Sequence, residues 1–267
     1  MRSLIGLMAL LASFGCYSQT VTYPAGIWTG SLVVNGAPLS GTGGNSQSVT
    51  IYVLPSGTFY GRTDLIPGDG ECLYLISGSL VKGGTQITTS LIAEYGGQVA
   101  SSACAPTKTG GAIGGSIAKR SGNVLYWTLA TPTLTAKYTL SLSTSYSTPS
   151  SLKALTGYWA SSPLANGVQL ETNGVELVLP SGAFSSHDPL LGCVTSGQYT
   201  VIDATHNLYT YTETFYDCYT ATREGKAFNN LKIYGVATIT GHTLHKQGAW
   251  GAASIAETEG GISAVGN

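Results

Sequence analysis

GYWASSPLANG, residues 157–167, and VLPSGAF, residues 178–184, together repeat the pattern of an earlier stretch of the same chain. The earlier copies are GIWTGSLVVNG, residues 26–36, and VLPSGTF, residues 53–59. Both halves place a tryptophan, an Asn-Gly pair and a Pro-Ser-Gly turn in the same order. The sequence therefore predicts one structural unit that occurs twice.

The composition indicates that this unit is built from strands and turns. Only 9% of the 267 residues are charged, whereas about 25% is typical of soluble domains. Glycine accounts for 36 residues, and tyrosine (16) far outnumbers phenylalanine (5). Helices draw on Ala, Glu, Lys and Leu, so this composition favours β structure. The net charge of −1 provides no electrostatic footprint for nucleic acid.

Short alternating runs, separated by glycine- and proline-containing turns, predict about eight strands per unit. We therefore expect an all-β chain of two tandem small antiparallel β-barrels or barrel-like sandwiches with an internal repeat. A Ser/Thr/Pro-rich stretch separates the two halves and predicts a linker. The expected organisation is unit 1 over 24–143, a linker over 144–154, unit 2 over 155–257 and a disordered tail over 258–267.

The N-terminus has the pattern of an export signal. Arg2 precedes an apolar run from Leu4 to Leu11, which is too short to span a bilayer as a helix. Two processing sites remain open. The signal covers either residues 1–15, followed by a lipidated Cys16, or residues 1–18 with ordinary cleavage. Both alternatives place the mature chain outside the cytoplasm, where disulfides persist.

The cysteine count supports two local disulfides. Removing or lipidating Cys16 leaves four cysteines, two in each unit. A hairpin centred on Thr205 places Cys193 opposite residue 217, next to Cys218, so these two cysteines are expected to pair. Repeat symmetry then predicts a bridge between Cys72 and Cys104.

Several of these motifs resemble a known group of proteins. They are Cys16 at the end of a signal, Gly-Ile-Trp-Thr-Gly at 26–30, Ser-Leu-Lys-Ala-Leu-Thr-Gly-Tyr-Trp at 151–159, Gly-Cys at 192–193 and Gly-Val-Ala at 235–237. This pattern resembles a group of uncharacterised proteobacterial lipoproteins. The resemblance implies an envelope location and a barrel-like fold, and it implies no enzymatic activity.

Residues that could support chemistry are few. The loop from Asp64 to Glu71 holds three acids but lacks the alternating spacing of a calcium loop, so solvated turn acids are the favoured interpretation. His187-Asp188 occurs without a nucleophile elbow, which favours a turn histidine over a catalytic triad. His242 and His245 fall on opposite faces of a strand. We therefore expect no catalytic residue, metal site or cofactor.

Aromatic residues divide into expected core and candidate surface. Trp28 and Trp159 occupy equivalent positions and are expected in the two cores. A tyrosine stripe near Phe215 is most simply barrel packing, and any exposed part of it could stack on a sugar or a partner protein. The candidate binding residues are Tyr209, Tyr211, Tyr216 and Tyr219.

These observations favour a non-catalytic, exported binding or interaction module, because closed barrels place ligands at loops or at the barrel mouth. The expected partner is an envelope protein or a carbohydrate, and the membrane is contacted only through the lipid anchor. The expected location is the outer membrane as a lipoprotein, or the periplasm or extracellular space. The alternatives are a structural envelope or surface component without a small ligand and, less favoured, an envelope hydrolase.

Overall fold

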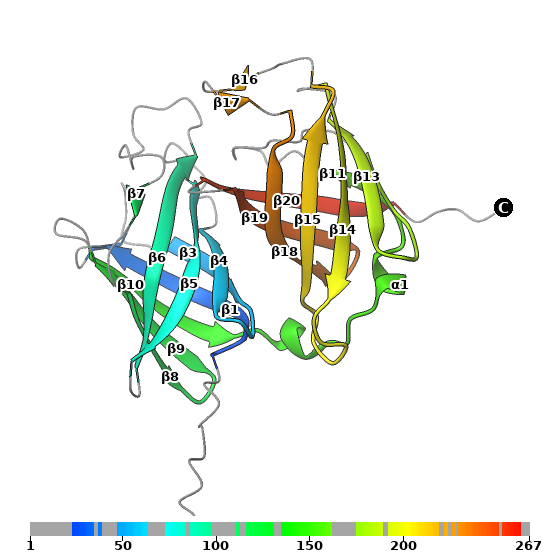
Figure 1. The fold of residues 1–267 in the computed structure, drawn as a ribbon. Helices are drawn as coiled ribbons and strands as arrows, with labels where there is room; N and C mark the ends of the chain where they lie inside the picture. Colours follow the sequence, from blue (N-terminus) through cyan, green and yellow to red (C-terminus); the bar gives the residue numbers. More distant parts are fainter. Residues whose placement is uncertain are drawn as a thin grey trace, which may run out of the picture.

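The structure is a computed structural model of the 267-residue chain. It describes residues 23–34, 37–38, 47–63, 73–83, 86–97, 111–112, 116–130, 135–161, 175–188, 192–218, 222–223, 226–227, 229–250 and 253–262. The chain forms two antiparallel β-barrels that lie side by side (Figure 1). The predicted all-β fold of two similar tandem barrel units is therefore confirmed.

The N-terminal barrel is a ring of eight strands in which each strand pairs with the next and β10 pairs with β1 to close the ring. Two short strands, β2 (Ala37–Pro38) and β7 (Gly111–Ala112), pair with β1 and β6 outside this ring. The ring strands are β1 (Gly26–Val34), β3 (Gln47–Val53), β4 (Thr58–Thr63), β5 (Leu73–Gly83), β6 (Gln86–Gly97), β8 (Ser116–Ser121), β9 (Val124–Ala130) and β10 (Thr135–Leu142).

The C-terminal barrel follows the same route through eight strands, and β20 pairs with β11 to close it. A separate two-stranded ribbon of β16 (Thr222–Arg223) and β17 (Lys226–Ala227) interrupts the connection from β15 to β18. The ring strands are β11 (Gly157–Ser161), β12 (Val175–Val178), β13 (Ala183–Asp188), β14 (Cys193–Val201), β15 (Tyr209–Tyr216), β18 (Lys232–Thr240), β19 (Thr243–Trp250) and β20 (Ala253–Ile262).

The repeat extends to single hydrogen bonds. The indole Nε1 of Trp28 donates to the carbonyl oxygen of Pro24 at 2.8 Å, and that of Trp159 donates to Leu155 at 2.7 Å. Both tryptophans are buried, as the sequence predicts. Each ring therefore ties the start of its first strand to the chain that enters the barrel.

The two Pro-Ser-Gly turns make equivalent hydrogen bonds. Gly57 and Gly182 have φ of 87° and 83°, a left-handed conformation that glycine adopts without strain. Their carbonyl oxygens accept hydrogen bonds, both at 2.8 Å, from the amides of Leu80 and Tyr199. The turn thus fixes the register between the second hairpin and the following strand in both barrels.

The connection between the barrels contains two short helical turns, η1 (Thr144–Ser147) and α1 (Leu152–Leu155). Both begin at a serine, Ser143 and Ser151, whose hydroxyl accepts a backbone N–H of the turn. The predicted linker, 144–154, therefore has a defined conformation, because serine caps satisfy backbone groups that would otherwise need water.

A shared apolar cluster joins the two barrels. Each barrel has its own core, and a third cluster combines N-terminal residues with the linker and the C-terminal barrel. The side-chain amide of Gln247 on β19 also donates to the carbonyl oxygen of Gly61 on β4. The barrels are therefore packed against each other rather than merely tethered. The third cluster consists of Ile27, Tyr52, Leu54, Tyr60, Tyr146, Leu208 and Val236.

The last strand extends further than the sequence indicates. β20 ends at Ile262, which pairs with Tyr158 on β11. Residues 258–262, which the sequence analysis assigns to the tail, are thus part of the ring, because β11 needs a partner for its backbone groups when the barrel closes. The signal at 1–18, with Cys16, and the final residues 263–267 lie outside the described residues.

Candidate functional site

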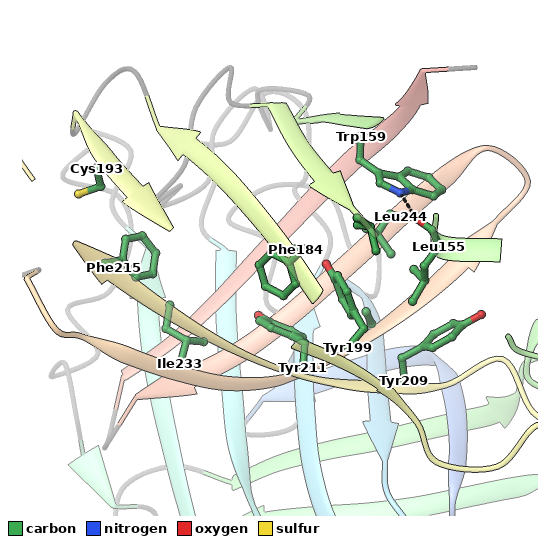
Figure 2. Close-up of a cluster of buried hydrophobic side chains, with 12 residues drawn as sticks. Leu155, Trp159, Phe184, Cys193, Tyr199, Tyr209, Tyr211, Phe215, Ile233 and Leu244 are labelled. Carbon is green, nitrogen blue, oxygen red and sulfur yellow. Dashed lines mark hydrogen bonds between the residues drawn. The ribbon is translucent and has the colours of Figure 1, made fainter. Parts of the chain in front are cut away.

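The interior of the C-terminal barrel holds a cluster of charged side chains among its aromatic core residues (Figure 2 shows the aromatic part). We call Glu176, Glu213, Lys246 and Tyr199 the buried charge cluster. The Lys246 ammonium lies 2.9 Å from Oε2 of Glu176 and 3.3 Å from Oε2 of Glu213. The Tyr199 hydroxyl donates to Oε1 of Glu176 at 2.7 Å. These four side chains have at most 1% of their surface exposed.

Strand alternation places these residues inside the barrel. Side chains two apart on a strand share a face. Glu176 therefore shares the inner face of β12 with Val178, and Glu213 lies between Tyr211 and Phe215 on β15. Lys246 follows Leu244 on the inner face of β19. A small residue makes space nearby, because a Cβ at Gly248 would lie 2.6 Å from the Tyr211 hydroxyl.

Aromatic rings surround the Lys246 ammonium. Its Nζ lies 5.1 Å from the centre of the Phe184 ring and 5.2 Å from that of Tyr211. These distances are in the range of cation–π attraction, which strengthens when the cation is removed from water. The ammonium is thus held by two carboxyl groups and two ring faces.

Two carboxyl groups share one ammonium, and the surroundings shift the pKa of Glu176. Burial raises the pKa of Glu176, and the nearby Glu213 carboxylate raises it further, while Lys246 and the Tyr199 hydroxyl oppose the shift. Two negative charges against one positive charge leave an excess of one negative charge when every group is ionised. The net result is a raised pKa for Glu176, and burial is its largest cause.

The cluster leaves polar atoms without partners. Among the described residues, Oε1 of Glu213 and the hydroxyl of Thr195 on β14 are buried and accept or donate no hydrogen bond. Such groups are costly in a barrel core and mark a place where chemistry or a bound group can act. Sequence reasoning did not single out the cluster. The available signal was a charged residue at an inward position of three alternating segments. These segments are VELV at 175–178, YTETFY at 211–216 and HKQGAW at 245–250.

The predicted tyrosines fall into two environments. Tyr209 and Tyr211 point into the barrel and belong to its core (Figure 2). The Tyr209 hydroxyl donates to the carbonyl oxygen of Ser151 at 3.2 Å. Tyr216 lies on the outer side of β15 and is half-buried. Tyr219 lies outside the described residues.

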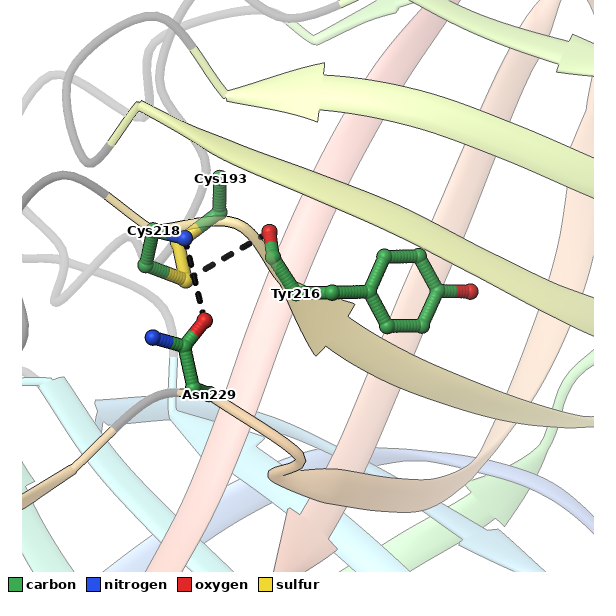
Figure 3. Close-up of a disulfide and its surroundings, with 4 residues drawn as sticks. All are labelled: Cys193, Tyr216, Cys218 and Asn229. Carbon is green, nitrogen blue, oxygen red and sulfur yellow. Dashed lines mark hydrogen bonds between the residues drawn. A yellow bond between two sulfur atoms is a disulfide. The ribbon is translucent and has the colours of Figure 1, made fainter.

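The second unit contains the predicted disulfide (Figure 3). Val194 pairs with Tyr216, so the hairpin is centred on Thr205 as expected. Asp217 adopts a left-handed φ of 52°, ends β15 and turns Cys218 back toward Cys193. Their Cα atoms are 4.0 Å apart, slightly closer than the 4.4 Å lower end of the usual range. Cys72 and Cys104 lie outside the described residues.

The remaining candidates do not converge on a site. His187 is exposed on the outer side of β13, and His242 is exposed in the turn before β19. The acidic loop from Asp64 to Glu71 and the side chain of Asp188 lie outside the described residues. Within the described part of the chain, no group of three or more His, Cys, Asp or Glu side chains is placed to hold a metal ion.

The outer face of the C-terminal barrel carries almost no charged side chains along four neighbouring strands and the start of a fifth. We call the outward positions of β12 to β15 and the start of β18 the neutral outer face. Among its described side chains only Lys232 carries a fixed charge, and Tyr234 is 55% exposed. The face consists of Val175, Leu177, Ala183, Ser185, His187, Val194, Ser196, Gln198, Thr200, Thr210, Thr212, Thr214, Tyr216, Lys232 and Tyr234.

Comparisons of the chain with protein-family models, with curated proteins and with solved structures give no match. Among the described residues, no helix has the length and apolar character needed to cross a membrane. Functional inference therefore rests on the residues and their geometry.

Proposed function

We propose that this protein is an exported, lipid-anchored, non-catalytic binding module whose neutral outer face binds a neutral polysaccharide of the cell envelope. The observation that carries the proposal is the nearly uncharged face with one exposed tyrosine ring, Tyr234, and one half-buried ring, Tyr216. Sugars offer hydroxyl groups for hydrogen bonds and C–H faces for aromatic rings, and a neutral glycan needs no charged partner.

The register of the strands arranges suitable groups in rows. Tyr234 pairs with Thr212, which pairs with Gln198, so a ring, a hydroxyl and an amide lie side by side. In a second row, Tyr216 pairs with Val194. The two tyrosines are four residues apart in register, about 13 Å along the strands. That separation exceeds one sugar ring and suits an oligosaccharide chain.

Binding to neutral polysaccharides tests the proposal. Affinity electrophoresis of the mature protein in gels that contain a dextran or a mannan should show retardation. Tyr234→Ala and Tyr216→Ala should each reduce it, since stacking is lost. Tyr126→Ala is the matched control, because Tyr126 is 49% exposed on the other barrel. Absence of retardation with every neutral polysaccharide, or equal loss in the Tyr126 control, would refute the proposal.

The anchoring part of the proposal has a separate test. The signal-like N-terminus and the resemblance to envelope lipoproteins support lipidation of Cys16. Cys16→Ser should move the protein from the membrane fraction to the soluble fraction, because firm attachment depends on the acyl chains. Mass spectrometry of the wild-type N-terminus provides the decisive measurement, and a mature chain that starts at Gln19 without lipid would contradict lipidation.

A further inference from the structure

In the N-terminal barrel, the positions equivalent to Lys246 and Glu176 are occupied by apolar residues. Trp127 and Lys246 are each the fourth residue of their strand, and they pair with Ala118 and Ala237 respectively. Ile51 and Glu176 each lie two residues before the Val-Leu-Pro turn. The same fold therefore accepts apolar side chains at these places.

This internal comparison argues against a purely structural role for the cluster. Replacing a buried ion pair by apolar residues of similar volume is often neutral or stabilising. Leu80 occupies the position of Tyr199, because both amides donate to the glycine of the Pro-Ser-Gly turn. Leu80, Ile51 and Trp127 are all buried in the N-terminal core. Packing alone would thus be satisfied by the apolar set, and the charged set has another use.

The geometry brings an amine and a carboxyl group together away from water. Nζ of Lys246 lies 2.9 Å from a carboxyl oxygen of Glu176, and the carboxyl group of Glu213 lies on the same nitrogen at 3.3 Å. Rings of Phe184 and Tyr211 cover the amine. In well-oriented intramolecular reactions, effective concentrations reach about 10⁵–10⁸ M.

We propose that Lys246 and Glu176 form an intramolecular amide bond between Nζ and Cδ, with Glu213 transferring the proton. This is a covalent modification within the barrel and is independent of glycan binding. The unpartnered Oε1 of Glu213 is a buried acceptor available to take that proton. The Tyr199 hydroxyl, bonded to Glu176 Oε1, stabilises the oxygen that becomes negative during the attack.

The reaction balances within the cluster and needs no external reagent. A proton passes from the Lys246 ammonium to Glu176, which gives a neutral amine and a carboxylic acid. The Nζ lone pair attacks Cδ, and the Glu213 carboxylate accepts a proton from nitrogen and delivers it to the departing hydroxyl. The C–O bond breaks, the N–C bond forms, one water molecule leaves and Glu213 returns to its starting state.

The bond would link strands that are not neighbours. Glu176 on β12 and Lys246 on β19 are 70 residues apart in sequence, and β11 and β20 lie between their strands in the ring. A covalent link at this place prevents the first and last hairpins of the barrel from separating. It therefore adds to the disulfide, which closes only the hairpin of β14 and β15.

Peptide mapping of the wild-type protein is the primary test. Trypsin cleaves after Lys153, Arg223, Lys226, Lys232 and Lys246 in this region, so a free chain yields 154–223, 233–246 and 247–267 as separate peptides. With the amide, cleavage after Lys246 is blocked. One branched product should join 154–223 to 233–267, with a mass lower than the sum of its two parts by one water molecule. The disulfide lies within 154–223, so reduction leaves this branch intact.

Variants test the role of each group. Lys246→Met should abolish the branched product, and Glu213→Gln should slow its formation by roughly 10²–10⁴-fold, the usual contribution of general acid–base catalysis. Lys232→Arg is the matched control, since this exposed lysine on β18 lies outside the cluster, and it should keep the product in full.

The proposal stands or falls on the wild-type map, so it does not depend on whether a variant folds. Recovery of free 233–246 and of 154–223 at full mass, from correctly folded protein, overturns it. A branched product that forms at the wild-type rate in folded Glu213→Gln overturns the assignment of Glu213 as the proton carrier.

Discussion

The two barrels follow the same path with different interiors. In the N-terminal barrel, Trp127 packs its indole edge-on against Phe59 at 4.5 Å between ring centres. In the C-terminal barrel, the equivalent Lys246 places its ammonium over the equivalent Phe184 at 5.1 Å. The same barrel fold therefore accepts either an apolar indole or a charged ammonium at one inner position. The route of the chain and the chemistry of its interior are therefore determined by different residues.

Removal of the buried ammonium should give the largest effect. We expect Lys246→Met to lower the free energy of unfolding of the C-terminal barrel by at least roughly 3–5 kcal/mol, because the two carboxyl groups then lose their buried counter-charge and the proposed amide to Glu176 cannot form. Urea unfolding measures this change. Ile92 pairs with Gly78 as Glu213 pairs with Gly197, so Ile92 is the N-terminal counterpart of Glu213. Transplanting the N-terminal residues, as Glu176→Ile, Glu213→Ile and Lys246→Trp together, should recover the electrostatic part of the loss. A triple variant less stable than Lys246→Met would show that the interiors are not interchangeable.

The disulfide should have the next largest effect and act on one barrel. Replacing Cys193 and Cys218 together by serine should cost about 3 kcal/mol, because the bridge closes a loop with a separation of 25 residues. Hydrogen exchange resolved by peptide should show faster opening in β14 and β15. Protection of β1 and β3 should persist, since their core is separate, and equal loss in both barrels would mean that the shared cluster of Ile27 and Val236 couples them fully.

The tryptophan pair should show equal, smaller effects in the two barrels. Trp28→Phe and Trp159→Phe each remove one buried indole hydrogen bond, to Pro24 and Leu155 respectively. Leaving a buried carbonyl oxygen without its partner costs about 1–3 kcal/mol. Denaturation of the two variants should therefore show matched losses, and a change of one barrel alone would contradict the structural equivalence.

Acid should loosen the turn that contacts the linker, and this is the smallest effect. Hydrogen bonds from Thr205 and His206 lower the pKa of Asp203 from 3.8 to about 2. A lowered folded-state pKa stabilises the turn above the unfolded value near pH 4, and this contribution disappears as the pH falls through about 2. NMR of the Thr205 amide should report the change between pH 4 and 2. Asp203→Asn should remove that pH dependence, and an unchanged profile would contradict the assignment.

Much of the fold was predictable because it depends on local patterns. The Pro-Ser-Gly turns follow from the preferences of turn residues, and the equivalent burial of Trp28 and Trp159 follows from the repeat. The pairing of Cys193 with Cys218 followed from a hairpin turn centred on Thr205, which the strand register confirms. The end of β20 at Ile262 was missed, since a Gly-rich segment becomes a strand here only through its pairing with β11.

The candidate sites were less predictable. Tyr209 and Tyr211 belong to an alternating stripe whose face the sequence leaves open, and the barrel places both inside. Glu176, Glu213 and Lys246 each look like an ordinary strand residue. Their strands are distant in sequence, so only ring closure brings the three charges within hydrogen-bond distance.

The repeat, the all-β class, the turns and the hairpin with the Cys193–Cys218 bridge can all be read from the sequence, because each of them depends on contacts within one or two neighbouring strands. The tertiary structure alone decided the packing of one barrel on the other and the meeting of Lys246 with Glu176 and Glu213. Those contacts join residues from strands that are distant in sequence. Barrel closure brings these strands close in space, and their separation along the chain does not predict it.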